Sequence, residues 1–142
     1  MSVPPFVQYE TTDEYRAHYE RMYCQSPVPT FDGYQVRFRK DRFEHCFYES
    51  TRRNKVKDQF SWQRAKRIDW IKAALQDPDA ELYVGWDNKR KRHDHTHRVT
   101  VIVEDYVVVI RLSKRMTAQF VTAYVADSQR TIDRIRSSPR WR

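Results

Sequence analysis

Residues 97–112 read HRVTVIVEDYVVVIRL, and this stretch decides the fold class. It contains two apolar runs of strand length, Val99–Val103 and Tyr106–Leu112, both rich in β-branched residues. Only Glu104-Asp105 separates the runs, and these two residues suit a tight turn. The stretch therefore predicts an antiparallel β-hairpin.

Two further predicted strands flank this hairpin. Glu81–Asp87 precedes it across the loop NKRKRHDHTH, and Ala118–Val125 follows it. Four consecutive strands joined in this way predict an antiparallel meander. An earlier segment, Tyr34–Arg39, alternates apolar and polar residues and predicts a half-exposed strand with a basic outer face.

Helical patterns lie before and after the strands. Asp13–Gln25 has an apolar stripe at helical spacing, with Thr12 or Asp13 as its cap. Ser61 is a good cap for a helix that runs to Gln76, and 127–137 predicts a short basic helix. Residues 40–51 show neither period, and 52–59 predict a loop. The order indicates an α+β fold, with helices packed on one face of a four-stranded antiparallel sheet.

The length of 142 residues favours a single domain. Within it we expect an N-terminal arm and helix (1–33), a core (34–127) and a basic C-terminal helix and tail (128–142). No apolar run approaches the ~18 residues of a membrane span. The N-terminus lacks the pattern of a secretory signal, and two cysteines form no disulfide framework, so we expect a cytoplasmic protein.

The charge balance favours a polyanionic partner. The chain has 27 Lys and Arg against 19 Asp and Glu, a formal net charge of +8. It has only two glycines, Gly33 and Gly85, so the glycine-rich loops that bind ATP or NAD phosphates are excluded. We therefore expect no cofactor.

The last predicted strand carries two candidate functional residues. Alternation places Val121, Ala123 and Val125 on one face, and Thr122 and Tyr124 with Phe120 on the other. Thr and Tyr hydroxyls can donate hydrogen bonds to a phosphate, and Tyr can also donate a proton. The alternative is that both are ordinary strand residues.

Two further candidates lie outside the strands. His45 carries an imidazole, which suits acid–base chemistry near neutral pH, although an isolated histidine is often structural or merely exposed. Arg64 projects into the apolar face formed by Ala65, Ile68, Ile71 and Leu75. Its guanidinium can clamp a phosphate, or it can pair with an Asp or Glu in the core.

The loop before the central hairpin is the most basic part of the chain. Lys89, Arg90, Lys91 and Arg92 suit a phosphate-binding hairpin loop or a solvated charged tip. His93, His95 and His97 alternate, which leaves a zinc site as a third, weaker alternative because the neighbouring cations repel a metal ion. We expect no metal site, and the role of these histidines stays open.

Three segments, FSWQRAKRIDWIKAALQDPDAELYVG, HRVTVIVEDYVVVIRL and AQFVTAYVAD, resemble the phage- and toxin-associated nucleases of the Barnase–EndoU–colicin–RelE group. The resemblance covers about residues 34–127. It rests on an upstream His, a helix that ends in Asp-Pro, a meander containing a tyrosine and a terminal strand reading TAY. Here these elements are His45, Asp77-Pro78, Tyr106 and Thr122-Ala123-Tyr124.

The resemblance implies a RelE-like ribonuclease fold and a metal-independent endoribonuclease, similar to a toxin or effector. In such enzymes the RNA 2′-OH attacks the neighbouring phosphorus and leaves a 2′,3′-cyclic phosphate. His45 is then the acid–base group, Tyr124 a second proton-transfer group, Thr122 a phosphate ligand and Arg64 the group that stabilises developing charge. The implied partners are RNA (tRNA or mRNA) and an antitoxin or immunity protein, with no membrane. The implied substrate-binding residues are Arg67, Lys89, Arg90, Lys91, Arg92 and Arg111.

These expectations place the four catalytic candidates in one cleft, on the sheet face away from Val121 and Val125. Two alternatives to an enzyme remain open. One is a non-catalytic nucleic-acid-binding or phage-associated interaction protein, in which basic patches act together with Trp62, Trp70 and Trp141. The other is a phage structural protein whose basic surface meets packaged DNA.

Overall fold

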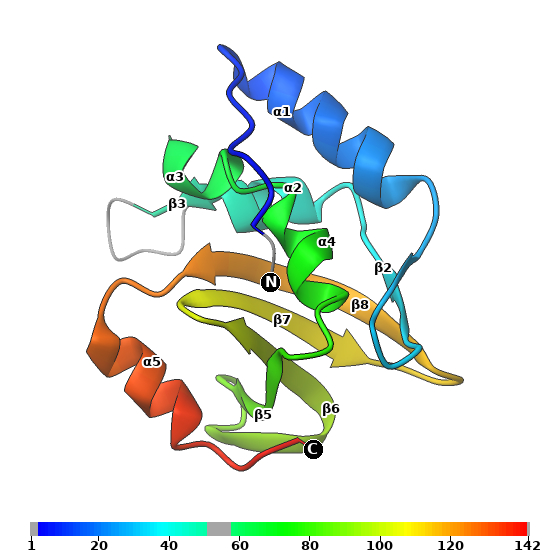
Figure 1. Ribbon diagram of the computed structural model, residues 1–142, viewed down its shortest axis with the longest axis vertical. Helices are drawn as coiled ribbons and strands as arrows, with labels where there is room; N and C mark the ends of the chain where they lie inside the picture. The colour runs from blue at the N-terminus through cyan, green and yellow to red at the C-terminus, as the bar shows by residue number, and fades with distance from the viewer. Residues whose placement is uncertain (1–2, 51–57, 142) are drawn as a thin grey trace.

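The computed structural model describes residues 3–50 and 58–141. It is an α+β structure with one large mixed sheet and a small separate sheet (Figure 1). The strands are β1 (Val28–Pro29), β2 (Gln35–Arg37), β3 (Tyr48–Glu49), β4 (Gln59–Phe60), β5 (Glu81–Asp87), β6 (Arg92–Val103), β7 (Tyr106–Leu112) and β8 (Thr117–Val125). The helices are α1 (Thr12–Tyr19), a π-helical turn η1 (Glu20–Cys24), α2 (Arg42–Phe47), α3 (Trp62–Ala65), α4 (Trp70–Leu75) and α5 (Gln129–Arg136).

The large sheet has six strands in the order β1-β2-β8-β7-β6-β5, and β3 pairs with β4 in a separate two-stranded sheet. Strands β5 to β8 do form an antiparallel meander. However, β2 adds to β8 in parallel and β1 adds to β2, so the predicted four-stranded antiparallel sheet is wrong. The strand predicted at 34–39 is present as β2, with Val36 buried and Gln35 and Arg37 exposed, but its place in the large sheet was not predicted. Strand β1 has only two residues, too few to show an alternating pattern. A parallel pair also has no local turn to mark it in the sequence.

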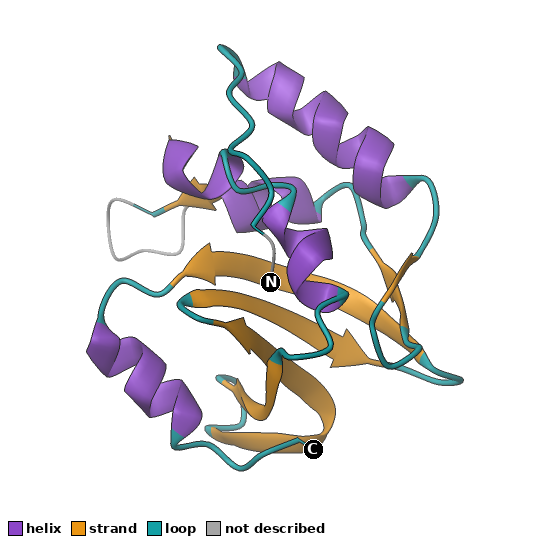
Figure 2. Ribbon diagram, in the orientation of Figure 1, coloured by secondary structure: helices purple, strands orange, loops and turns teal. Residues whose placement is uncertain are grey.

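Helices cover both faces of the large sheet, which corrects the prediction of a single covered face (Figures 1 and 2). Residues of α1 to α4 pack with one face, in a core that includes Tyr106 and Val108. On the other face Ile132 of α5 packs with Ile102 and Val107. The apolar run in β7 has no polar alternation because both of its faces are covered at this point.

The helices also differ from the predicted ones. Thr11, rather than Thr12 or Asp13, caps α1, and the helical segment continues beyond Tyr19 as η1. The 40–51 segment forms α2 and β3, although it shows no period of its own. The predicted loop at 52–59 lies outside the described residues except for its last two positions, of which Gln59 belongs to β4.

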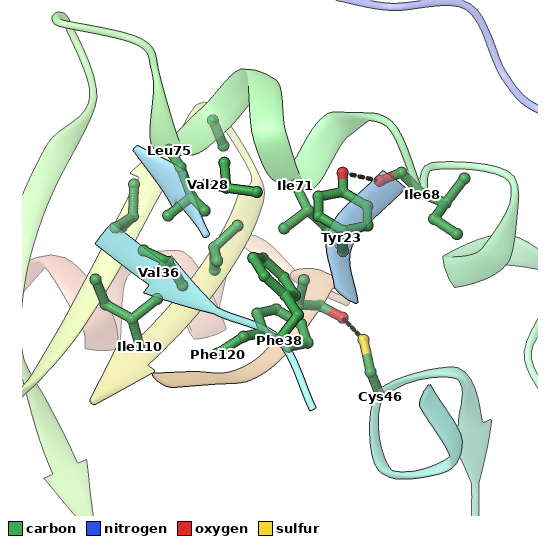
Figure 3. Packing of buried hydrophobic residues seen from close by; sticks show 14 of the residues in the cluster. Tyr23, Val28, Val36, Phe38, Cys46, Ile68, Ile71, Leu75, Ile110 and Phe120 are labelled. Carbon is green, nitrogen blue, oxygen red and sulfur yellow. Dashed lines mark hydrogen bonds between the residues drawn. The ribbon is translucent and has the colours of Figure 1, made fainter. Parts of the chain in front are cut away.

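The predicted helix from Ser61 is divided into α3 and α4. Ser61 caps α3, as predicted, and the expected apolar face is buried, with Ile68 and Ile71 fully enclosed. Between the two helices the Tyr23 hydroxyl donates to the carbonyl of Ile68 (2.6 Å) and accepts from the amide of Lys72 (3.1 Å), as Figure 3 shows in part. These two groups would bond to each other in a continuous helix, so the inserted hydroxyl accounts for the interruption.

Tyr23→Phe is expected to lower the free energy of unfolding by about 1–3 kcal/mol, because it leaves the Ile68 carbonyl and the Lys72 amide without their buried partner. Chemical denaturation measures the change. Tyr34→Phe is the matched control, since the Tyr34 side chain makes no hydrogen bond with the described residues. Equal unfolding free energies for the two variants would show that the Tyr23 hydroxyl contributes nothing.

Both cysteines are free; Cys46 is buried and Cys24 is partly buried. Figure 3 shows Cys46 at the edge of the large core, beside β8. None of the helices within 3–50 and 58–141 is long and apolar enough to cross a bilayer.

Candidate active site

One face of the large sheet is covered only in part, by α5, and is called the open face below. A β-bulge in β8 decides which side chains reach it. Val109 pairs with Thr122 and Ile110 pairs with Phe120, so Val121 is the extra residue. Because a bulge interrupts the alternation, Phe120 packs in the large core and Val121 lies on the open face beside Thr122. The predicted faces of Phe120 and Val121 are therefore wrong, while Thr122 does lie on the face opposite the buried Ala123.

The open face carries a groove with a volume of about 770 Å³. Strands β6, β7 and β8 supply residues of its lining, α5 and the β5–β6 hairpin supply others, and α2 contributes His45. Among the described residues that line it, none is Asp or Glu. The polar and aromatic lining residues are His45, Trp86, Asn88, His93, Arg98, Thr100, Thr122, Tyr124, Arg134, Ser137 and Ser138.

Two anchors hold α2 against the bulge and so position His45. The Arg42 guanidinium donates to the Val121 carbonyl from Nε (3.2 Å) and Nη2 (2.7 Å). One turn later, the Cys46 thiol donates to the Ala123 carbonyl at 3.5 Å. His45 lies between these anchors, is exposed and lines the groove together with Thr122. Without Arg42 the bulged carbonyl would lose its bidentate donor.

Tyr124 lies where the groove meets a second hollow of about 350 Å³. Burial raises the pKa of its phenol above the ordinary value, and the charges of Arg64 and Arg134 oppose this shift only in part. The hydroxyl is therefore protonated at neutral pH and can donate a hydrogen bond or a proton. The carboxylate of Asp127 also raises the pKa of the phenol, so the two arginines are the groups here that can stabilise developing negative charge.

Arg64 lines the second hollow rather than the groove itself. Its side chain leaves α3 toward α2 and β8: Nη1 donates to the Cys46 carbonyl (3.0 Å), and Cζ lies 5.7 Å from the centroid of the Tyr124 ring. Nε is 3.4 Å from Oε1 of Glu49, whose side chain is 50% exposed. Arg64 thus has a carboxylate partner, but a weakly held one that solvent also reaches.

The remaining predicted binding residues lie in three places. Arg67 lines the second hollow with Arg64, and its guanidinium carbon lies 5.0 Å from the ring centroid of Phe6 and 5.1 Å from that of Trp70. Arg111 is exposed on β7, directly opposite Arg98 of β6. The loop cations are all exposed at the β5–β6 hairpin, where three of them line a third hollow of about 610 Å³. The three lining residues are Arg90, Lys91 and Arg92; the fourth loop cation, Lys89, lies outside that lining.

The loop histidines have different surroundings. His93 lies 3.2 Å from the Ser138 hydroxyl and lines the groove. His97 contacts Thr96 and Asp94 at the base of the hairpin. Within the described ranges, no group of three or more His, Cys, Asp or Glu side chains is placed to hold a metal ion. The zinc alternative for His93, His95 and His97 therefore has no support from their placement.

Three groove residues were not predicted from the sequence. Trp86, Arg98 and Arg134 line the groove, and none of them was singled out as a binding residue. One signal for Arg98 was present in Gly85: a Cβ at that position would overlap Cγ of Arg98 and lie 2.9 Å from its Cδ. A glycine in the interior of a strand often marks such a close approach.

Comparison with known proteins gives no match: no family model, curated protein or solved structure matches this chain.

Proposed function

We propose that this chain is a metal-independent endoribonuclease, similar to a toxin or effector, that acts in the cytoplasm. The observation that carries the proposal is the meeting of His45, Thr122 and Tyr124 in one groove with a cationic lining that contains no carboxylate among the described residues. His45 comes from α2, far from β8 in sequence. An acid–base group, hydroxyl donors and cations are what phosphodiester transesterification requires.

In the proposed reaction, His45 accepts the proton of a ribose 2′-OH. The 2′-oxygen attacks the neighbouring phosphorus and the bond from phosphorus to the 5′-oxygen breaks. A proton passes to that 5′-oxygen, so one proton is taken up and one is delivered in each cleavage. The products are a 2′,3′-cyclic phosphate and a 5′-hydroxyl, and neither an oxidant nor a cofactor is needed.

The other residues bind and stabilise the reacting phosphate. Tyr124 is protonated and lies beside two cations, which suits it to donate to the leaving oxygen. Thr122 pairs with Val109 and lines the groove, and its side chain also hydrogen-bonds with the Cys46 thiol. In the proposed reaction its hydroxyl donates to a phosphate oxygen instead. Arg134 lines the groove and Arg64 the second hollow, and the charges of both act on Tyr124. In the proposed reaction they stabilise charge on the phosphorane.

The formal charge of +8 favours RNA as the substrate, with tRNA and mRNA as the two classes to test. The Barnase–EndoU–colicin–RelE nucleases that the sequence motifs resemble support the same activity, because His45 and the Thr122-Ala123-Tyr124 motif both contribute to the groove lining. An acidic antitoxin or immunity protein is the protein partner that fits this surface by charge.

The direct test is incubation of the purified protein with total RNA in EDTA, followed by analysis of the new ends. We expect cleavage with 2′,3′-cyclic phosphate and 5′-hydroxyl ends. Cleavage that stops on chelation and returns with added Mg²⁺ or Zn²⁺ would contradict the proposal. RNA that is bound but left intact would favour the non-catalytic nucleic-acid-binding alternative.

Neutralising Lys89, Arg90, Lys91 and Arg92 together is expected to flatten the salt dependence of RNA binding. Each phosphate contact contributes about −0.7 to the slope of log K against log salt for single strands, so losing most of the four should change it by roughly 2–3 units. A salt titration of binding to an uncleavable oligonucleotide measures the slope. A slope equal to that of the parent would mean that the hairpin is only a solvated tip.

A further inference from the structure

Trp86 is the exposed aromatic residue that connects the groove with the basic hairpin. It is 47% exposed and lines both the groove and the hollow formed by the hairpin. The His93 ring contacts it edge-on, with centroids 5.2 Å apart and planes at 90°. This contact orients the indole while leaving nearly half of the residue open to solvent, as a stacking surface for a planar ligand requires.

Arg98 lies beside this surface and is held in an unusual way. Its aliphatic stem lies across Gly85 so closely that any Cβ there would overlap it. Its Nε is buried and has no hydrogen-bond partner in the described part of the chain. An unsatisfied buried donor costs free energy, so a bound acceptor would relieve it.

Arg98 also faces a second cation. Its partner across the β6–β7 ladder is Arg111, and residues paired in this way project from the same face of the sheet. Like charges directly opposite each other destabilise a sheet. Neither guanidinium lies within ion-pair distance of a carboxylate of the described residues. Asp87 is the nearby acidic group: the backbone N–H groups of Arg90 and Lys89 and then the charge of Arg98 lower the pKa of its carboxyl. The arrangement is therefore best stabilised by a bound anion.

We propose that Trp86, Arg98 and Arg111 form a subsite for one unpaired nucleotide of the RNA strand, an inference that rests on the proposed ribonuclease function. The base stacks on the Trp86 indole and its phosphate binds between the two guanidinium groups. Because a base inside a duplex offers no free face for stacking, the subsite selects single-stranded RNA or loops over helical RNA. It places the strand along the groove that holds His45 and Thr122.

The test uses a fluorescently labelled RNA oligonucleotide with 2′-O-methyl groups throughout, which the proposed reaction cannot cleave. Trp86→Ala is expected to weaken its binding by about 5- to 100-fold, and Trp86→Phe to retain most of the affinity. Phe31→Ala is the control, because Phe31 is also an exposed aromatic residue (40% exposed) but lies outside the groove and the hairpin hollow. Its affinity should equal that of the parent, and a duplex of the same sequence should compete poorly.

Gly85→Ala gives an independent test, since it leaves every charge in place and only moves Arg98. We expect it to weaken binding by a factor similar to that of Arg98→Ala. Unchanged binding in Trp86→Ala and Arg98→Ala, or equal competition by the duplex, would overturn the subsite. If the parent still cleaves total RNA in EDTA, unchanged binding or equal competition overturns the subsite but not the ribonuclease proposal. If the parent binds the oligonucleotide through Trp86 but cleaves no RNA, the ribonuclease proposal fails and the subsite stands.

Discussion

His45→Gln is expected to reduce RNA cleavage by about 10²- to 10⁴-fold while RNA affinity stays within a few fold of the parent. Glutamine is close to histidine in size and keeps hydrogen-bonding groups, but it cannot accept the proton of the 2′-OH. The anchors made by Arg42 and Cys46 do not involve the His45 side chain, so α2 should keep its place. Single-turnover cleavage of a labelled RNA measures the rate.

Glu44→Gln is the control for this variant. Glu44 is the neighbouring residue on α2, is exposed and pairs with Arg16 rather than lining the groove. Its removal should leave the cleavage rate close to that of the parent. If His45→Gln cleaves at the parent rate, the acid–base assignment is wrong, and Tyr124 or His93, which also line the groove, would have to take the role.

Arg64→Ala is expected to lower cleavage by about 10²- to 10³-fold, because it removes a preorganised cation beside Tyr124. A single loop substitution, Lys89→Ala, should have a much smaller effect, since Lys89 lines neither the groove nor the second hollow, where Arg64 meets Tyr124. The cleavage rate and the melting temperature are measured together. Added guanidinium should restore part of the activity of Arg64→Ala, which a purely structural loss would not allow.

Glu49→Gln separates the two roles of Arg64. It removes the ion pair, whose atoms are 3.4 Å apart, but keeps the guanidinium and its bond to the Cys46 carbonyl. We expect cleavage near the parent rate. If Glu49→Gln and Arg64→Ala lose activity equally, Arg64 acts as the partner of a structural ion pair and not as a charge donor to the reaction.

The sequence predicts the fold best where a pattern is long and local. The predicted bounds of β5 and β7 agree with the structure, because each is a seven-residue strand bounded by turn residues. The predictions miss β1, which has only two residues, and they miss the parallel pairing of β2 with β8, because that partner lies far along the chain. They also fail for the division between α3 and α4, which depends on a hydroxyl from Tyr23 that no local pattern reveals.

The residues of the groove could likewise be predicted only where a local pattern was enough. Alternation was enough to place Thr122 and Tyr124 on one face of β8, but the bulge that moves Val121 depends on the pairing with β7. Arg134 reaches the groove because α5 packs on the sheet face that was predicted to carry no helix. Trp86 and Arg98 enter it through the hairpin and the glycine at position 85, which are contacts made only in the folded chain.

The most direct test of the proposed activity uses a DNA oligonucleotide with one internal ribonucleotide, incubated with the protein in EDTA and analysed by mass spectrometry. We expect a single cut after the ribonucleotide, giving a 2′,3′-cyclic phosphate and a 5′-hydroxyl, and no cut when that nucleotide is 2′-deoxy or when the protein carries His45→Gln. Cleavage of the all-deoxy strand, or products with 5′-phosphate ends, would contradict attack by the 2′-OH in this groove.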